Sequence, residues 1–242
     1  MTIFTVVRAD VAPEAGARED EFVRWWAEEH QREYVAEPGF RRCWLLRRLD
    51  HPGAVGARPQ RYSAVYEVDG VDEFNRVLDA APPWGPWQRY VDTWLLNWER
   101  TYRTLLSTRS RDGAQGAHWA IVTADVDLPT DRDERDFHTW YEERHVPELL
   151  ANPGFHRAVR LRLAPHDRDL GSRGHRFWAV YEVDDPDDFA GALRRRREAG
   201  QAAWEHWADA VTDWSVSLHR VVNRIDADPA DGAGRTDEGA RA

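Results

Sequence analysis

Hydrophobic and polar positions alternate along four segments in each half of the chain, and each segment predicts a β-strand. The predicted strands are 3–9, 42–49, 61–69 and 94–106 in the first half, and 119–126, 157–163, 176–184 and 213–224 in the second. Amphipathic helices are predicted at 18–36 and 132–151, each ended by Pro-Gly, and further helices from Val71 onward and at 186–210. Each half therefore has the predicted order βαββαβ.

The two halves match each other when the sequence is displaced by 115 positions. Matched positions include Phe22 with Phe137, Trp25 with Trp140, Glu28 with Glu143, His30 with His145, and Pro38-Gly39-Phe40 with Pro153-Gly154-Phe155. The run 64–69 (AVYEVD) recurs at 179–184. A period of this length exceeds that of solenoid repeats and predicts the duplication of a whole small domain.

The order βαββαβ predicts a ferredoxin-like unit, in which helices cover one face of an antiparallel sheet and the other face needs a partner. Two such sheets can cover each other, so we expect an α+β fold in which the two units form one intramolecular α+β barrel. The expected boundaries are unit 1 at 1–106, a linker at 107–117, unit 2 at 118–225 and a disordered tail at 226–242.

The segment 140–147 (WYEERHVP), followed by Asn152-Pro153-Gly154-Phe155, resembles the first-helix signature of the EthD-like group in the dimeric α+β barrel superfamily. The segment 25–32 (WWAEEHQR) is similar, but lacks the proline two residues after the histidine. This difference suggests that the second half keeps the active pocket while the first half is its covalently linked barrel partner.

The resemblance implies a range of activities. The superfamily includes cofactor-independent oxygenases of aromatic polyketides, aldol cyclases, isomerases, decarboxylases and dehydratases, many of them in secondary metabolism. It also includes haem-binding branches. A pseudo-dimer within one chain is implied, and a further homodimer is compatible with it.

Composition narrows these classes. The net charge of −10 argues against nucleic acid or an anionic membrane as a partner, and all 33 basic residues are arginine, which removes lysine-dependent chemistry. The single cysteine, Cys43, excludes an intramolecular disulfide. No apolar run of spanning length or export signal is evident, so we expect a cytoplasmic protein; the arginine- and alanine-rich composition is typical of a GC-rich bacterial genome.

Two histidines are the main catalytic candidates. His145 shares a helix face with Phe137, Tyr141 and Leu149, and His30 shares one with Phe22, Trp26 and Tyr34. A histidine on an apolar stripe is often a neutral core residue. In a dry pocket it can instead act as a general base or acid, and His145 is the first choice for that role. Glu28 and Glu143 point elsewhere on the helix and are expected in solvent.

Arginine, tyrosine and tryptophan side chains complete the candidate sites. Arg162 and Tyr181 are predicted to stabilise an enolate, although an outward Arg162 paired with surface acids is the simpler alternative. The predicted substrate-binding residues are Tyr141, Trp26, Arg47, Tyr66, Trp98 and Trp214. A pocket walled by such rings suits a planar aromatic substrate, and the same rings can equally be packing residues.

No metal site or cofactor is expected, because the histidine spacings match no ligand motif and neither a nucleotide-binding glycine motif nor a nucleophile elbow occurs. The favoured hypothesis is an enzyme that removes a proton beside a carbonyl of an aromatic or polyketide-like substrate. Cyclisation, dehydration, decarboxylation, isomerisation and oxygenation all remain open. The alternatives are a non-catalytic carrier and a haem-binding barrel protein.

Overall fold

The structure is a computed structural model of the chain, and it describes residues 1–80, 90, 92–111, 115–126, 134–171, 174–199, 207 and 210–228. The strands are β1 (Ile3–Val11), β2 (Phe40–Arg48), β3 (Tyr62–Val68), β4 (Leu95–Ser110), β5 (His118–Val126), β6 (Phe155–Leu163), β7 (Phe177–Val183) and β8 (Val211–Asp226). The helices are η1 (Pro13–Ala15), α1 (Arg18–Trp25), η2 (Trp26–His30), α2 (Gln31–Val35), α3 (Val71–Ala80), α5 (Glu134–Trp140), η3 (Tyr141–His145), α6 (Val146–Leu150) and α7 (Pro186–Glu198).

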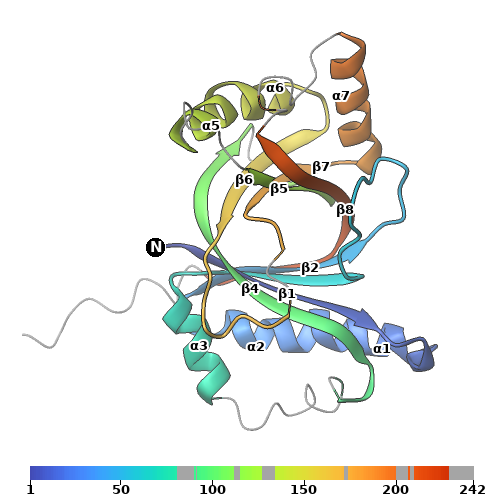
Figure 1. Cartoon of the computed structure of the whole chain (residues 1–242). Helices are drawn as coiled ribbons and strands as arrows, with labels where there is room; N and C mark the ends of the chain where they lie inside the picture. The colour runs from blue at the N-terminus through green and yellow to red at the C-terminus, as the bar shows by residue number, and fades with distance from the viewer. Residues whose placement is uncertain are drawn as a thin grey trace, which may run out of the picture.

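All eight strands belong to one closed antiparallel barrel with the order β1-β3-β2-β8-β5-β7-β6-β4. Helices α1, α2 and α3 cover one side of the barrel, and α5, α6 and α7 cover the opposite side (Figure 1). The α+β fold with an eight-stranded antiparallel sheet, expected from the sequence, is thereby confirmed.

Two seams join the strands of the two halves. At one seam β2 pairs with β8, and at the other β4 pairs with β6. Within each half the register follows the displacement seen in the sequence, since Ile3 lies opposite Val68 and His118 lies opposite Val183. The last strand is displaced by one further residue: Val6 faces Thr101 on β4, whereas Ile121 faces Ser217 on β8.

Barrel closure explains the strongly apolar inner strands. Every residue of β3 and of β7 is buried, because one face of each strand points into the barrel and the other faces a helix layer. The barrel interior is filled by aromatic and branched side chains, and Trp44 meets Trp119 across it with ring centroids 5.1 Å apart. Two further apolar clusters lie between the strands and the helices, one in each half.

Some expected boundaries shift in the structure. Strand β4 continues to Ser110 and pairs with β6, so residues 107–110 are part of the barrel and not of a connecting linker. The helix expected at 186–210 is seen as Pro186–Glu198, and the helix from Val71 ends at Ala80 within the described part. Residues 112–114 of the linker, 127–133, 229–242 of the tail, and the Pro82-Pro83 break lie outside the described residues.

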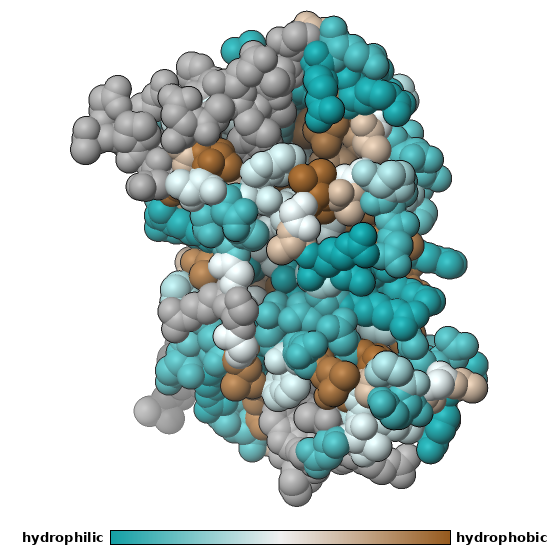
Figure 2. Space-filling model, turned by 45° about the vertical axis from the view of Figure 1, so that its right-hand side comes forward, coloured by the Kyte–Doolittle hydropathy of each residue, from teal (hydrophilic) through white to brown (hydrophobic). Residues whose placement is uncertain are grey.

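The outer surface is mostly hydrophilic on the face shown in Figure 2, with hydrophobic residues scattered over it. The large hydrophobic side chains that are most exposed in the described part come from separate elements, among them Leu96 on β4, Leu170 after β6 and Val222 on β8. No described helix is long and apolar enough to cross a membrane.

The contact between Trp44 and Trp119 predicts that the two halves unfold together. Trp44→Ala should lower the free energy of unfolding by about 3–5 kcal/mol, because it opens a large cavity in the shared barrel core. Urea denaturation followed by tryptophan fluorescence and by circular dichroism should give one coincident transition. Leu96→Ala, at an exposed position, is the matched control and should cost less than about 0.5 kcal/mol. Two separated transitions in the Trp44 variant would contradict a shared core.

Candidate functional site

A π-helical turn lies in the middle of the long helix of each half. These turns are η2 and η3, and each ends at a candidate histidine, His30 or His145. In an α-helix, residues four apart drift by about 40° around the axis. The wider π turn offsets that drift and keeps Phe22, Trp26 and His30 buried on one stripe. Such turns are rare and often occur at functional sites.

His30 lines a small cavity of about 20 Å³ between the helix and the sheet. Trp26, His30 and Tyr34 come from the helix, and Tyr66 comes from β3. The remaining wall is formed by Val7 of β1, Phe74 and Leu78 of α3, and Trp98 and Arg100 of β4. The structure therefore brings four sequence-predicted residues, Trp26, His30, Tyr66 and Trp98, around one cavity.

The side chains around this cavity are held in defined protonation states. Burial lowers the pKa of His30 to about 4, so its imidazole is neutral near pH 7. Burial also raises the pKa of Tyr34 to about 12 and that of Tyr66 well above its usual value, so both hydroxyls keep their protons. Burial lowers the pKa of Arg100, but a guanidinium remains charged in proteins.

Arg100 is fixed by the loop that follows β6. Its Nε and Nη2 both donate to the backbone carbonyl of Arg168, at 3.2 and 2.9 Å, and its backbone pairs with Leu170. Arg168 is itself held by a two-point ion pair with Asp79 of the α3 helix. A neutral proton acceptor, phenolic donors and a fixed cation thus surround one space, which is the set needed to remove a proton and stabilise the resulting anion.

His145 occupies the equivalent place in the second half and is almost completely buried. Its ring stacks on Trp140 at 5.0 Å and meets the edge of Tyr141 at 4.6 Å between centroids. Burial, followed by the charges of Arg196 and Arg160, lowers its pKa to about 3. The Tyr181 hydroxyl is also fully buried, and burial raises its pKa well above the usual value. Tyr141 thus contacts His145, and its hydroxyl group interacts with that of Tyr181.

Arg160, and not Arg162, supplies the cation beside these residues. The Arg160 guanidinium lies 4.0 Å from the centre of the Tyr141 ring and donates to Glu142 at 2.8 Å. Arg162 is 44 % exposed in its side chain and pairs with Glu134 at 3.1 Å, which is the surface alternative considered for it. Arg47, its match in the first half, is also exposed. Glu28 and Glu143 are exposed, as expected.

The cations of the two halves come from different strands. Arg100 of β4 has Val216 at the equivalent place on β8, and Arg160 of β6 has Leu45 at the equivalent place on β2. Sequence analysis missed Arg100, although the alternation of Trp98, Arg100 and Tyr102 along one face of a strand could have revealed it. Trp214, the register match of Trp98, packs at the edge of the second-half core. Within the described ranges, no cluster of three or more metal-ligating side chains is found.

The buried histidines predict acid-sensitive stability. The folded pKa of His145 lies below the usual value of about 6.5, so the unfolded chain takes up a proton first as the pH falls. The contribution of neutral His145 to the free energy of unfolding is therefore fully present above pH 6.5, and it is lost as the pH falls from there toward 3. Between pH 7.5 and 5.0, His145 should account for a loss of about 2 kcal/mol.

Urea denaturation at both pH values tests this expectation with His145→Gln, which cannot titrate. The stability gap between wild type and variant should narrow by about 2 kcal/mol on acidification. His118→Gln, at a partly exposed position, is the matched control for the substitution itself. A gap that stays constant would show that His145 is not held neutral by burial.

Comparison with known proteins shows what this architecture resembles. No family model matches the chain, and no curated protein matches it by sequence. Among solved structures, an anthrone oxidase-like protein aligns with a TM-score of 0.63 and 13% identity over 93% of this chain and 92% of its own. A candidate monooxygenase from Fusobacterium nucleatum gives 0.63 and 10% over 93% and 94%, and one from Lactobacillus acidophilus gives 0.58 and 11% over 94% and 99%. The chain therefore shares the fold of monooxygenase-like α+β barrel proteins along nearly its whole length.

Proposed function

We propose that this protein is an oxygenase-type enzyme that acts on an aromatic small molecule in the His30 cavity. The observation that carries the proposal is the convergence of His30, Tyr66 and Arg100 from a helix and two strands onto one space walled by Trp26 and Trp98. The fold shared with proteins named as monooxygenases and as anthrone oxidase-like supports the reaction class. The resemblance in the helix motif supports a place in bacterial secondary metabolism.

The first step is removal of a proton from a carbon conjugated with a carbonyl. Neutral His30 takes the proton, and the electron pair left on the substrate is delocalised onto the carbonyl oxygen as an enolate. A carbon acid gives up its proton only where the anion is stabilised, and Arg100 with the protonated Tyr66 provides that stabilisation. The anion also compensates the charge on the imidazolium, so His30 can hold a proton that burial alone would disfavour.

The second step uses dioxygen as the oxidant. The enolate carbon transfers two electrons to O₂ and forms a C–O bond, and the resulting peroxide anion takes back the proton from His30. Loss of water from the hydroperoxide then gives a new carbonyl, so that R₂CH₂ and O₂ become R₂C=O and H₂O. The base is regenerated, and the substrate supplies every electron that reduces oxygen.

Substrate entry requires movement of the cavity wall. A cavity of about 20 Å³ holds roughly one water molecule, which is far less than an aromatic ring system needs. Trp98 and Leu78 are only partly buried, whereas Trp26 and Phe74 are completely buried. We therefore propose that Trp98 and Leu78 move aside when the substrate binds, while the rest of the wall stays fixed.

We further interpret the barrel as two ferredoxin-like units in tandem, with His145, Tyr141 and Tyr181 as the counterpart site. The displacement of 115 residues in sequence and in strand register supports this interpretation. The second half holds its own cation, Arg160, but the cavity we describe lies in the first half. We therefore assign the first reaction centre to His30, and not to His145 as the helix motif alone suggested.

Oxygen uptake with anthrone as the probe tests the proposal, with anthraquinone formation followed by absorbance. His30→Gln should lower the enzymatic rate by about 10²- to 10⁴-fold, because it removes the proton acceptor. His118→Gln, away from both helix stripes, is the matched control and should leave the rate unchanged. Heat-denatured protein sets the background of spontaneous oxidation.

Three outcomes would contradict parts of the proposal. A larger loss in His145→Gln than in His30→Gln would move the reaction to the second half. Anthrone that raises the melting temperature without oxygen uptake above background would favour a carrier. Uptake that is unaffected by both His30→Gln and His145→Gln would exclude chemistry centred on either histidine.

A further inference from the structure

A much larger cavity than the one at His30 lies at one end of the barrel interior. It has a volume of about 550 Å³, within the range of small-molecule sites. Residues of β1, β4, β5, β7 and β8 line it, together with residues 57–60 of the loop between β2 and β3. We call it the barrel-mouth cavity.

The sheet separates this cavity from the His30 cavity. Successive residues of a strand point to opposite faces. On β1, Val7 lines the His30 cavity and Arg8 lines the barrel-mouth cavity; on β4, Arg100 and Glu99 divide in the same way. The two cavities therefore lie on opposite faces of the sheet, and the backbone of β1 and β4 separates them.

Buried charge defines the inner part of the barrel-mouth cavity. Arg8 is 9 % exposed and its Nη1 lies 3.2 Å from Glu99, while its Nε makes no hydrogen bond to the described residues. Arg103 is buried next to Arg8, and both guanidinium groups lie over the Trp178 ring, at 4.3 and 3.9 Å from its centre. Two buried cations thus accompany one buried carboxylate at this end of the barrel.

Hydroxyl groups form the neighbouring wall. The Thr123 hydroxyl lies 2.7 Å from that of Ser215 and 2.8 Å from Nδ1 of His175. The other ring nitrogen of His175 lies 3.1 Å from Asp213, whose side chain is 72 % exposed at the rim. Polar groups linked by hydrogen bonds therefore form part of the cavity wall.

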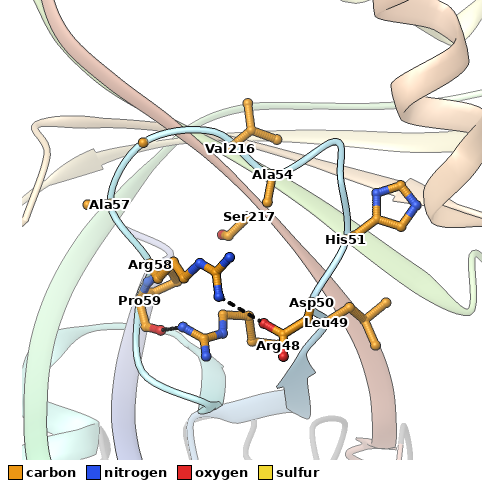
Figure 3. Close-up of a pocket in the computed structure, with 11 residues that line it drawn as sticks. Arg48, Leu49, Asp50, His51, Ala54, Ala57, Arg58, Pro59, Val216 and Ser217 are labelled. Carbon is orange, nitrogen blue, oxygen red and sulfur yellow. Dashed lines mark hydrogen bonds and ion pairs between the residues drawn. The ribbon is translucent and has the colours of Figure 1, made fainter.

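The loop between β2 and β3 forms the cover of this end. Figure 3 shows a smaller pocket that this loop itself encloses beside Ser217 of β8, with the side chains of Arg48 and Arg58 turned toward its inner side. Arg48 donates to the carbonyl of Pro59 at 2.7 Å, and Arg58 pairs with Asp50 at 3.2 Å. Gly56 adopts φ +76° and packs against the backbone of Trp214, so the loop can lie close to β8 there.

We propose that the barrel-mouth cavity is a second binding site and takes a small organic carboxylate. Arg8 is the residue that contacts the carboxylate, Arg58 attracts it at the rim, and Thr123 with Ser215 hydrogen-bonds its polar substituents. Guanidinium groups are preferred partners of carboxylates. Since both guanidiniums lie over Trp178, recognition rests on charge and hydrogen bonds and not on stacking against that ring.

Isothermal titration with benzoate, with benzyl alcohol as its neutral analogue, tests the site at low ionic strength. Benzoate should bind and benzyl alcohol should bind at least about tenfold more weakly. Arg58→Glu should weaken benzoate binding about tenfold, whereas Asp213→Asn should strengthen it about threefold, because each changes the charge at an exposed rim position. Opposite changes from two surface substitutions cannot arise from unfolding.

The inner contact is tested with a neutral pair. Arg8→Gln combined with Glu99→Gln removes both members of the buried ion pair, and it should abolish benzoate binding while the protein keeps its circular dichroism spectrum. His30→Gln serves as the control for the other cavity and should leave the benzoate affinity unchanged. Equal affinity for benzoate and benzyl alcohol, or an affinity that stays within about twofold in both rim variants, would overturn the proposal.

Discussion

Closure of the sheet is the constraint on which the rest of the structure depends. The seams β2–β8 and β4–β6 pair the edge strands of one half with those of the other, so no edge of the eight-stranded sheet is left open. Closure also gives every central strand two buried faces. Neither half has a solvated sheet face, and each depends on the other to cover the interior around Trp44 and Trp119.

That double burial creates three separate interiors in one small protein. The helix layers enclose an apolar space in each half, and the barrel encloses a third. Polar side chains also enter these spaces, and burial changes their properties. The imidazoles of His30 and His145 stay neutral, the phenol of Tyr66 keeps its proton, and the guanidinium groups of Arg8 and Arg103 are largely buried.

The spacing of hydrophobic residues predicted much of this architecture, because the residues on each face of a helix or strand reflect whether that face is buried. The shared stripe of Phe22, Trp26 and His30 is buried as its spacing indicates, and the matched strands pair in matching registers. The π turns at His30 and His145 carry no recognisable sequence signal. The extension of β4 through Ser110 was missed because its pairing with β6 is a long-range contact, which local polarity obscures.

The candidate arginines show the same limit. Arg162 and Arg160 lie on the same face of β6 and differ only in how far along the strand they sit, so alternation could not separate them. Their different environments come from the helix that packs on β6. Arg160 lies against the ring of Tyr141, whereas Arg162 pairs with Glu134 at the start of α5. Nothing in the local sequence distinguishes Arg8 and Glu99 from charged surface residues, because their burial results from closure of the barrel.

The reciprocal placement of the cations distinguishes the two halves of the barrel. In the first half, β4 carries Arg100 and β2 carries Leu45. In the second half the assignment is reversed, because β6, the counterpart of β2, carries Arg160 and β8, the counterpart of β4, carries Val216. Two identical copies cannot make this arrangement, since each substitution would appear in both. A single chain carries a separate residue at each of these matched positions, so its two halves can have different charge patterns and one protein can present two differently charged interiors.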